Sequence, residues 1–300
     1  MDAMTRARYQ AWVKRRIFKR VVIPGVLLLV VLIGVTWGLR WLGNREDVEE
    51  DDATSCLQEP CPEGLTTEPA DERLEQPVMS RQPTYQDFNF SIYNEAAIVE
   101  VGAQYLNSYL VLVNKVFRLP EDFSPRDLVV PEVLATWGHD NTNHQMRQVA
   151  ASALEALFNA AYEEAGLTLW AFSGYRSFEE QAYAHQYCLS THGCDEGEKR
   201  SARPGHSEHQ TGLTMDITAA SVGGILTQEL SKTPEGIWVA ENAHRFGFII
   251  RYPEGKTHLT GIIFEPWHIR YVGREAATYI FENDLVLEQY IFPLPQWEQP

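Results

Sequence analysis

The stretch Gly205-His-Ser-Glu-His-Gln-Thr-Gly-Leu-Thr-Met-Asp216 brings histidines, carboxylates and glycines together within one short segment. Its second half runs into residues 213–219, whose pattern predicts a β-strand. Polar residues beside the end of a strand are held by a rigid scaffold and can face a cleft. We therefore expect this stretch to supply both a strand of the central sheet and part of a functional site.

Two further polar clusters have the same placement. Ser173-Gly-Tyr-Arg-Ser177 follows a predicted strand at 167–172, and Glu265-Pro-Trp-His268 precedes one at 269–272. Pro266 argues against a regular helix here. Residues three apart on a straight strand lie on opposite faces, so we expect Glu265 in a bend before the strand that carries His268.

Three residues of these clusters form a candidate metal set, namely His209, Asp216 and His268. Two imidazoles and a carboxylate suit Zn²⁺ and leave a fourth position for water, as in catalytic zinc sites. Glu265 would then be the unligated carboxylate that takes a proton from that water. Taken by themselves, these residues are also compatible with ordinary polar side chains at strand ends.

The order of the remaining elements predicts an α+β domain with a central antiparallel sheet flanked by helices. A helix at 144–165 is indicated by apolar residues at three- and four-residue steps, with Gly166 placed to end it. The other predicted elements are strands at 109–114 and 248–251 and helices at 178–189, at 234–245 and from about residue 274.

The N-terminus has the pattern of a membrane anchor. Residues 1–20 are rich in Arg and Lys and precede the uncharged apolar run 21–39, which is close to the ~20 residues that span a bilayer core. Trp37 and Trp41 stand where interfacial aromatics are common. A cleavable signal peptide is the alternative, but no small-x-small cleavage site follows the run.

The positive-inside rule predicts that residues 1–20 are cytoplasmic and that the chain after Arg40 is extracytoplasmic. Residues 40–83 are acidic and contain several prolines, which is typical of a flexible linker. We expect one extracytoplasmic domain at 84–300. The net charge of −16 argues against a nucleic-acid partner, since binding phosphates requires clustered Lys and Arg.

Four cysteines fit an oxidising compartment and occur as two close pairs, Cys56 with Cys61 and Cys188 with Cys194. Three connectivities are open. We favour local pairing as structural disulfides because each pair is near in sequence and neither has the spacing of a zinc knuckle.

The three clusters together resemble VanY-type D-alanyl-D-alanine carboxypeptidases, which belong to the zinc DD-peptidase superfamily and share their fold with the hedgehog signalling domain. The similarity rests on Ser173-Gly-Tyr-Arg, on Ser207-Glu-His-Gln-Thr-Gly-Leu followed by Asp216, and on Glu265-Pro-Trp-His-Ile-Arg-Tyr271. It extends over about residues 110–272 and includes Gly247-Phe-Ile-Ile-Arg-Tyr-Pro253.

The resemblance implies roles for individual residues. His209, Asp216 and His268 match the zinc ligands, one ion per chain, and Glu265 matches the catalytic acid/base. Arg176 matches an arginine that stabilises the oxyanion, a task suited to a multi-donor cation. Ser207 and Gln181 match substrate-binding positions, and we expect Trp267 to pack in the pocket wall. His206 does not match a ligand, because the family uses the histidine that follows Ser-Glu.

The implied activity is zinc-assisted hydrolysis that releases the terminal D-alanine from peptidoglycan stem pentapeptides. An L,D-carboxypeptidase acting on tetrapeptide stems is the nearest alternative. A non-catalytic, zinc-stabilised binding domain for the cell wall is a further alternative, but it would have lost Glu265 or Arg176, and both are present.

Overall fold

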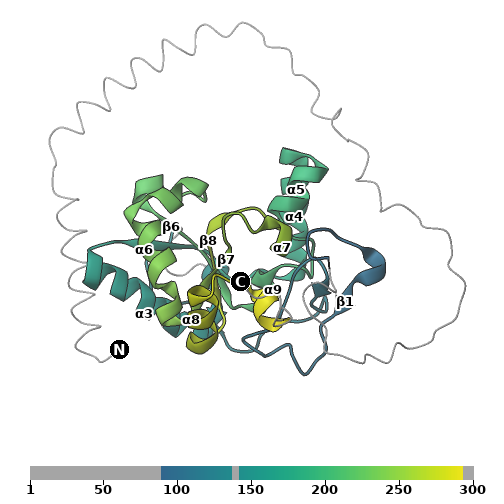
Figure 1. The fold of residues 1–300 in the computed structure, drawn as a ribbon, viewed down its shortest axis with the longest axis horizontal. Helices are drawn as coiled ribbons and strands as arrows, with labels where there is room; N and C mark the ends of the chain where they lie inside the picture. Colours follow the sequence, from purple (N-terminus) through teal and green to yellow (C-terminus); the bar gives the residue numbers. More distant parts are fainter. Residues whose placement is uncertain (1–88, 137–141, 293–300) are drawn as a thin grey trace, which may run out of the picture. The chain divides into compact units, whose positions relative to one another are not determined.

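The computed structural model describes residues 89–136 and 142–292 (Figure 1). All of them belong to one compact unit, 61–300. The anchor and linker predicted at 1–83, together with Cys56 and Cys61, lie outside the described residues. Within the described ranges, no helix combines the length and the apolar character needed to cross a membrane.

A four-stranded antiparallel sheet forms the centre of the domain, with the strand order β5-β6-β8-β7. The strands are β5 (Leu169–Ser173), β6 (Thr214–Ala219), β7 (Phe248–Tyr252) and β8 (Glu265–Tyr271). The predicted α+β class and the four strands at these positions are confirmed. Every residue of β6 is buried, so side chains on both of its faces are shielded from water.

The bend predicted before the strand at Glu265 is wrong. Glu265 belongs to β8, and the ladder between β7 and β8 is irregular at this point. β8 begins at Glu265, and the register passes from Ile250 opposite Ile269 to Tyr252 opposite Glu265. Two steps along β7 therefore match four along β8, which is the mark of a bulge. The bulge contains Pro266, which cannot donate to a ladder. It places Glu265 on the same side as His268, although the two are three residues apart.

Helices surround the sheet, and their termini follow local sequence signals. The helix predicted at 144–165 is α3 (Gln148–Ala165), which ends at Gly166 with a left-handed φ of 69°. Ser177 and Glu180 form a capping box that starts α4 (Phe178–His192). The other helices are α5 (Cys194–Arg200), α6 (Pro234–Asn242), α7 (Thr257–Thr260), α8 (Arg274–Glu282) and α9 (Leu287–Ile291).

Two hydrophobic clusters hold these elements together. The larger joins α3 to the sheet and includes Leu154, Leu157, Met215, Ile217 and Ile269, all fully buried. The smaller joins β7, α8 and α9 to the segment before residue 118. Two short ladders lie outside the main sheet, between β1 (Val99–Glu100) and β2 (Phe117–Arg118) and between β3 (Leu128–Val129) and β4 (Met146–Arg147).

The strand predicted at 109–114 is wrong. The apolar run is buried at Val111, Leu112 and Val113, but it pairs with no strand of the described chain. Instead, the Arg270 guanidinium donates to the carbonyl oxygens of Tyr109 and Val111, at 3.0 and 2.7 Å. The hydrophobic pattern thus predicted burial correctly, whereas a distant side chain provides the hydrogen bonds that a ladder would have provided.

Candidate metal centre

His209, Asp216 and His268 come together although they lie on three different elements. His209 lies in a 3₁₀ turn (Glu208–Thr211), Asp216 on β6 and His268 on β8. One donor atom from each side chain can be chosen so that all three lie within 4.8 Å of one another. His209 Nε2 is 3.3 Å from Asp216 Oδ2, and His268 Nδ1 is 3.0 Å from Asp216 Oδ1.

The backbone fixes which nitrogen of His209 faces this cluster. His209 Nδ1 lies 2.7 Å from the carbonyl oxygen of Gly174. A carbonyl only accepts, so Nδ1 carries the hydrogen and Nε2 is left as a lone-pair donor. A side chain at Gly174 would not fit, because its Cβ would lie 2.4 Å from the carbonyl oxygen of Gln145.

The donor set fits a zinc ion. Asp216 Oδ1 is buried and accepts no hydrogen bond within the described part of the chain. Burial raises the pKa of Asp216, but the neighbouring His209 and His268 outweigh it and hold that pKa well below its usual range. An ionised carboxylate between two imidazoles, with an oxygen unsatisfied, is an arrangement that a divalent cation completes.

Glu265 lies beside this set without belonging to it. Its Oε2 is 3.7 Å from His268 Nδ1, and the residue is 7% exposed. Burial raises the pKa of Glu265 to about 8, with Asp216 acting in the same direction and His268 and Arg176 opposing it. A carboxyl group with a pKa near neutrality can both take and return a proton at working pH.

Arg176 follows β5 and is held by two side chains. Its Nη1 donates to Gln181 Oε1 at 2.8 Å, and its Nη2 donates to Ser173 Oγ at 3.2 Å. Gln181 is buried and donates in turn to the carbonyl oxygen of Ala202 at 2.6 Å. In this structure Gln181 therefore orients the guanidinium.

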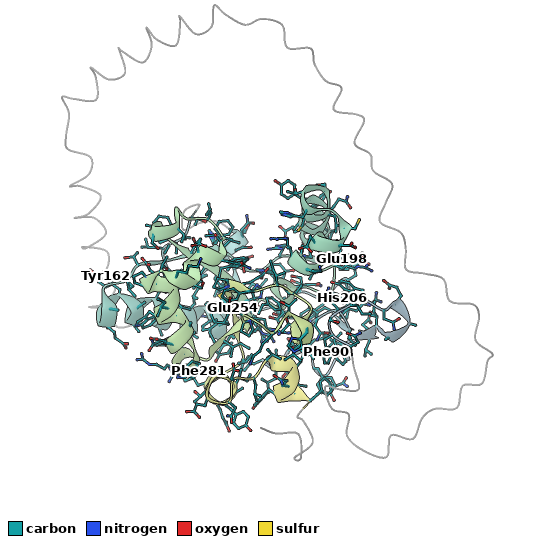
Figure 2. All side chains as sticks on the ribbon, turned by 45° about the horizontal axis from the view of Figure 1, so that its top comes forward. Phe90, Tyr162, Glu198, His206, Glu254 and Phe281 are labelled. Atoms are coloured by element: carbon teal, nitrogen blue, oxygen red, sulfur yellow. The ribbon has the colours of Figure 1, made fainter. Side chains whose placement is uncertain are left out.

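Ser207 and Trp267 are the other site residues predicted from sequence, and His206 is predicted not to be a ligand. Ser207 is buried next to the metal set, where its Oγ accepts from the backbone N–H of His209 at 3.4 Å. Trp267 is partly buried against the main core. His206 lies outside the set: its Nδ1 is 2.7 Å from the carbonyl oxygen of Asn114, and its ring packs edge-on against Tyr93. Figure 2 labels His206 among the side chains of the domain.

The cysteines differ from the local pairing expected between Cys188 and Cys194. Cys188 is a free thiol whose sulfur points to the carbonyl oxygen of Gly197 at 3.8 Å. Cys194 is disulfide-bonded, so these two cysteines do not pair with each other. Cys188 lies near the end of α4 with its sulfur directed at the backbone of Gly197, whereas Cys194 is the first residue of α5, so nearness in sequence does not bring the two sulfurs together.

The chain matches the family model of VanY, D-alanyl-D-alanine carboxypeptidase, over residues 143–274. It is also 31% identical to VanXYC of Enterococcus gallinarum, a bifunctional D-Ala-D-Ala dipeptidase and D-Ala-D-Ala carboxypeptidase, over 60% of this chain and 92% of that relative. The chain belongs to the VanY family. All three residues of the metal set lie inside the matched region.

Further relatives of this VanY-family chain differ in how much they share with it. The protein YodJ of Bacillus subtilis is 45% identical over 60% of this chain and 66% of its own length. The chain spans little more than half of two Enterococcus D-alanyl-D-alanine carboxypeptidases, 57% and 52% of their lengths. Among solved structures, the LdcB LD-carboxypeptidase has a TM-score of 0.62 at 40% identity, covering 70% of this chain and 96% of that one.

Sequence reasoning missed a group of buried charges around the VanY site. Glu208, Arg251, Arg270 and Glu288 have side chains with no exposed surface. A charge inside an apolar strand, such as Arg251 in Phe248–Tyr252, must be paired when it is buried. That signal was present in the sequence, although it does not say which acidic residue is the partner.

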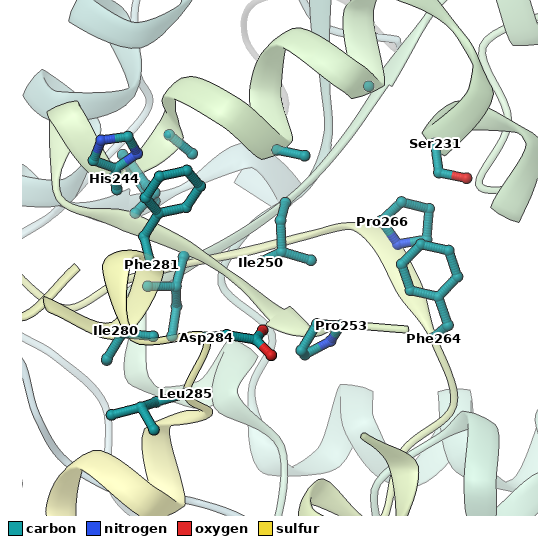
Figure 3. Close-up of a pocket in the computed structure, with 15 residues that line it drawn as sticks. Ser231, His244, Ile250, Pro253, Phe264, Pro266, Ile280, Phe281, Asp284 and Leu285 are labelled. Carbon is teal, nitrogen blue, oxygen red and sulfur yellow. The ribbon is translucent and has the colours of Figure 1, made fainter. Parts of the chain in front are cut away.

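The described part of the chain also contains an apolar cavity of about 270 Å³. Figure 3 shows side chains that line it. Ile250, Phe264, Pro266, Phe281 and Leu285 contribute to its wall. Phe264 and Pro266 flank Glu265 in sequence, yet neither Glu265 nor any residue of the metal set lines the cavity.

Proposed function

We propose that this chain is a zinc-dependent D-alanyl-D-alanine carboxypeptidase that releases the terminal D-alanine of peptidoglycan stem pentapeptides. The observation that carries the proposal is the position of Glu265, a buried carboxyl group with a raised pKa that lies next to the metal set but outside it. Membership of the VanY family supports the choice of substrate.

Each residue of the site has a distinct task in this proposal. His209 Nε2, the Asp216 carboxylate and His268 Nδ1 would hold zinc, which when bound supplies a Lewis acid that polarises the scissile carbonyl and makes water more acidic. Glu265 accepts a proton from the attacking water and returns it to the nitrogen of the leaving D-alanine. This double role requires a carboxyl pKa near the working pH.

Arg176 provides a fixed positive charge beside the reacting carbonyl. Gln181 and Ser173 hold its guanidinium, so little reorganisation is needed when negative charge develops on the carbonyl oxygen. We assign to the Ser207 hydroxyl a hydrogen bond to the terminal part of the substrate, and to Trp267 a place in the wall of the binding site.

An L,D-carboxypeptidase that acts on tetrapeptide stems is the second candidate. Its support is the 40% identity and TM-score of 0.62 to the LdcB LD-carboxypeptidase. The VanY match and the relationship to VanXYC favour the D,D activity. A non-catalytic binding domain is disfavoured because Glu265 and Arg176 are both present and lie near the metal set.

The deciding experiment compares two substrates on the zinc-loaded full-length chain. D-Alanine release is measured from a pentapeptide ending in D-Ala-D-Ala and from the tetrapeptide with one D-alanine fewer, with Glu265→Gln as the control. We expect a kcat/KM for the pentapeptide at least about tenfold higher. A higher kcat/KM for the tetrapeptide would establish the L,D alternative. If D-alanine were released from neither peptide, the proposed hydrolysis would be refuted in favour of a binding role.

We further propose that residues 21–39 anchor the protein in the membrane, with residues 1–20 in the cytoplasm and residues 40–83 as a spacer. The support is the length of the apolar run and the basic residues before it. In this arrangement the domain at 84–300 works outside the cytoplasm, where stem peptides are found.

A further inference from the structure

The buried charges next to the metal set form a neutral quartet of Glu208, Glu288, Arg251 and Arg270. One oxygen of Glu208, Oε1, accepts from Arg251 Nε at 2.8 Å and from Arg270 Nη1 at 2.5 Å. Arg251 then binds both oxygens of Glu288, at 2.9 and 2.6 Å. Two negative and two positive side chains thus neutralise one another away from water, which keeps a buried carboxylate ionised.

The second oxygen of Glu208 is used differently. Oε2 takes part in no hydrogen bond within the described part of the chain, and the same is true of His268 Nε2. These two buried atoms face each other at 3.7 Å. A shift of roughly half an ångström would bring them to hydrogen-bonding distance. A buried N–H or a buried carboxylate oxygen without a partner destabilises the folded protein, so this contact is favoured.

The direction of the His268 ring gives this contact a chemical meaning. His268 Nδ1 faces Asp216 and the metal set, whereas Nε2 faces Glu208. A ligand nitrogen needs a free lone pair, so the ring hydrogen of His268 has to be on Nε2. That hydrogen needs a buried acceptor, and Glu208 Oε2 is the acceptor in place.

We propose that Glu208 is a positioning residue that holds His268 in the tautomer and orientation required for metal binding. Carboxylates behind metal-binding histidines commonly have this effect. Glu208 is suited to it because Arg251 and Arg270 clamp its other oxygen, which fixes the direction of Oε2. The inference rests on the metal site of the proposed function, and it assigns a task to the residue directly before His209.

Glu288 provides a matched control within the same quartet. It lies on α9, beyond the region matched by the VanY family model, and it contacts Arg251 and Asn114. No hydrogen bond or ion pair joins Glu288 to His268 among the described residues. Glu288→Gln and Glu208→Gln therefore both remove one buried negative charge, but only the second changes the contact with His268.

The substitution Glu208→Gln tests the contact with His268 directly, because an amide has only one oxygen to accept hydrogen bonds. Arg251 and Arg270 both need that oxygen, so the amide NH₂ would turn towards His268 Nε2 and place a donor against a donor. The ring would then lose its acceptor and would favour the other tautomer, with the hydrogen on Nδ1.

The test uses the full-length chain after removal of metal with a chelator. The Zn²⁺ dissociation constant is measured by competition with a chromophoric chelator, the visible spectrum of the Co²⁺ form reports ligand geometry, and thermal unfolding of the metal-free form reports stability. Glu208→Gln should weaken zinc binding by about 10- to 100-fold and alter the Co²⁺ spectrum, while Glu288→Gln should stay within about threefold of wild type. Both should lower the Tm of the metal-free protein.

Two results would overturn the inference: wild-type zinc affinity in Glu208→Gln, or an equal loss of affinity in Glu288→Gln at the same loss of stability. If Glu208→Gln does not fold, the double variant Glu208→Gln/Arg270→Gln removes one charge of each sign and is measured in the same way. A wild-type chain that binds no zinc would refute the proposed function itself, whereas a zinc-binding Glu208→Gln variant would refute only the role of Glu208.

Discussion

Asp216 and His268 are direct partners across the antiparallel ladder of β6 and β8, and Asp216 Oδ1 lies 3.0 Å from His268 Nδ1. The two central strands of the sheet therefore present two of the three residues of the metal set side by side. His209 completes the set from the turn that precedes β6. A site built on paired central strands is formed before any ligand arrives, which keeps its reorganisation small.

The assignment of the metal set predicts which substitutions weaken zinc binding and which do not. Replacing His209, Asp216 or His268 by alanine should weaken zinc binding by more than about 100-fold, which exceeds the usual effect of losing a residue behind a ligand. His206→Ala is the control, since its ring contacts Asn114 and Tyr93 instead. Zinc content after dialysis measures the effect, and normal zinc in His209→Ala would refute the assignment.

Glu265→Gln should separate catalysis from metal binding. The amide keeps the size of the side chain and removes no ligand, so zinc should be retained. Loss of proton transfer should lower kcat by about 10²- to 10⁴-fold. Release of D-alanine from a pentapeptide and zinc content are measured on the same sample, and near-normal turnover would show that another group moves the proton.

Arg176→Ala should also retain zinc but lose stabilisation of the oxyanion. We expect kcat to fall by about 10²- to 10³-fold, with a smaller fall for Gln181→Ala, which leaves the guanidinium in place without one of its two side-chain partners. Arg118→Ala, in an exposed ion pair, is the control for loss of a positive charge. Equal activity of Arg176→Ala and Arg118→Ala would contradict the role.

The raised pKa of Glu265 predicts how the stability of the metal-free protein depends on pH. Its folded pKa of about 8 exceeds the ordinary value of 4.5, so its contribution to stability is fully present below about pH 4.5 and is lost as pH rises through 8. Glu265→Gln does not titrate. The Tm of metal-free Glu265→Gln minus the Tm of metal-free wild type should therefore increase by a few degrees from pH 5 to pH 8.5.

Thermal unfolding in the presence of a chelator measures this difference. Glu254→Gln, in the exposed loop after β7, is the control and should follow wild type at every pH. A constant difference in Tm between wild type and Glu265→Gln across this range would show that Glu265 does not titrate there.

The apolar run at 21–39 predicts that the full-length protein fractionates with membranes and that a chain starting after residue 40 does not. Immunoblotting of the membrane and soluble fractions from intact cells measures this. Recovery of a shortened, soluble form of the full-length chain would instead support a cleaved signal peptide.

Local patterns predicted much of the architecture. Apolar spacing and Gly166 indicated α3, and the polar clusters marked the ends of β5 and the starts of β6 and β8. These features depend on residues close together in the chain, where backbone preference and hydrophobic periodicity act directly. The same motifs named His209, Asp216 and His268, because the residue types that bind zinc are few.

Contacts between distant segments decided the rest. The bulge that turns Glu265 towards His268 exists only in the pairing of β8 with β7. The segment 109–114 pairs with no strand of the described chain, and Arg270 donates to two of its carbonyl oxygens instead. The quartet that joins Glu208 to Glu288 spans 80 positions of sequence. By itself, the sequence determined which chemical groups are present and which local segments are apolar. Only the tertiary structure decided which buried charges neutralise one another, since a buried charge requires a partner but does not specify where in the chain that partner lies.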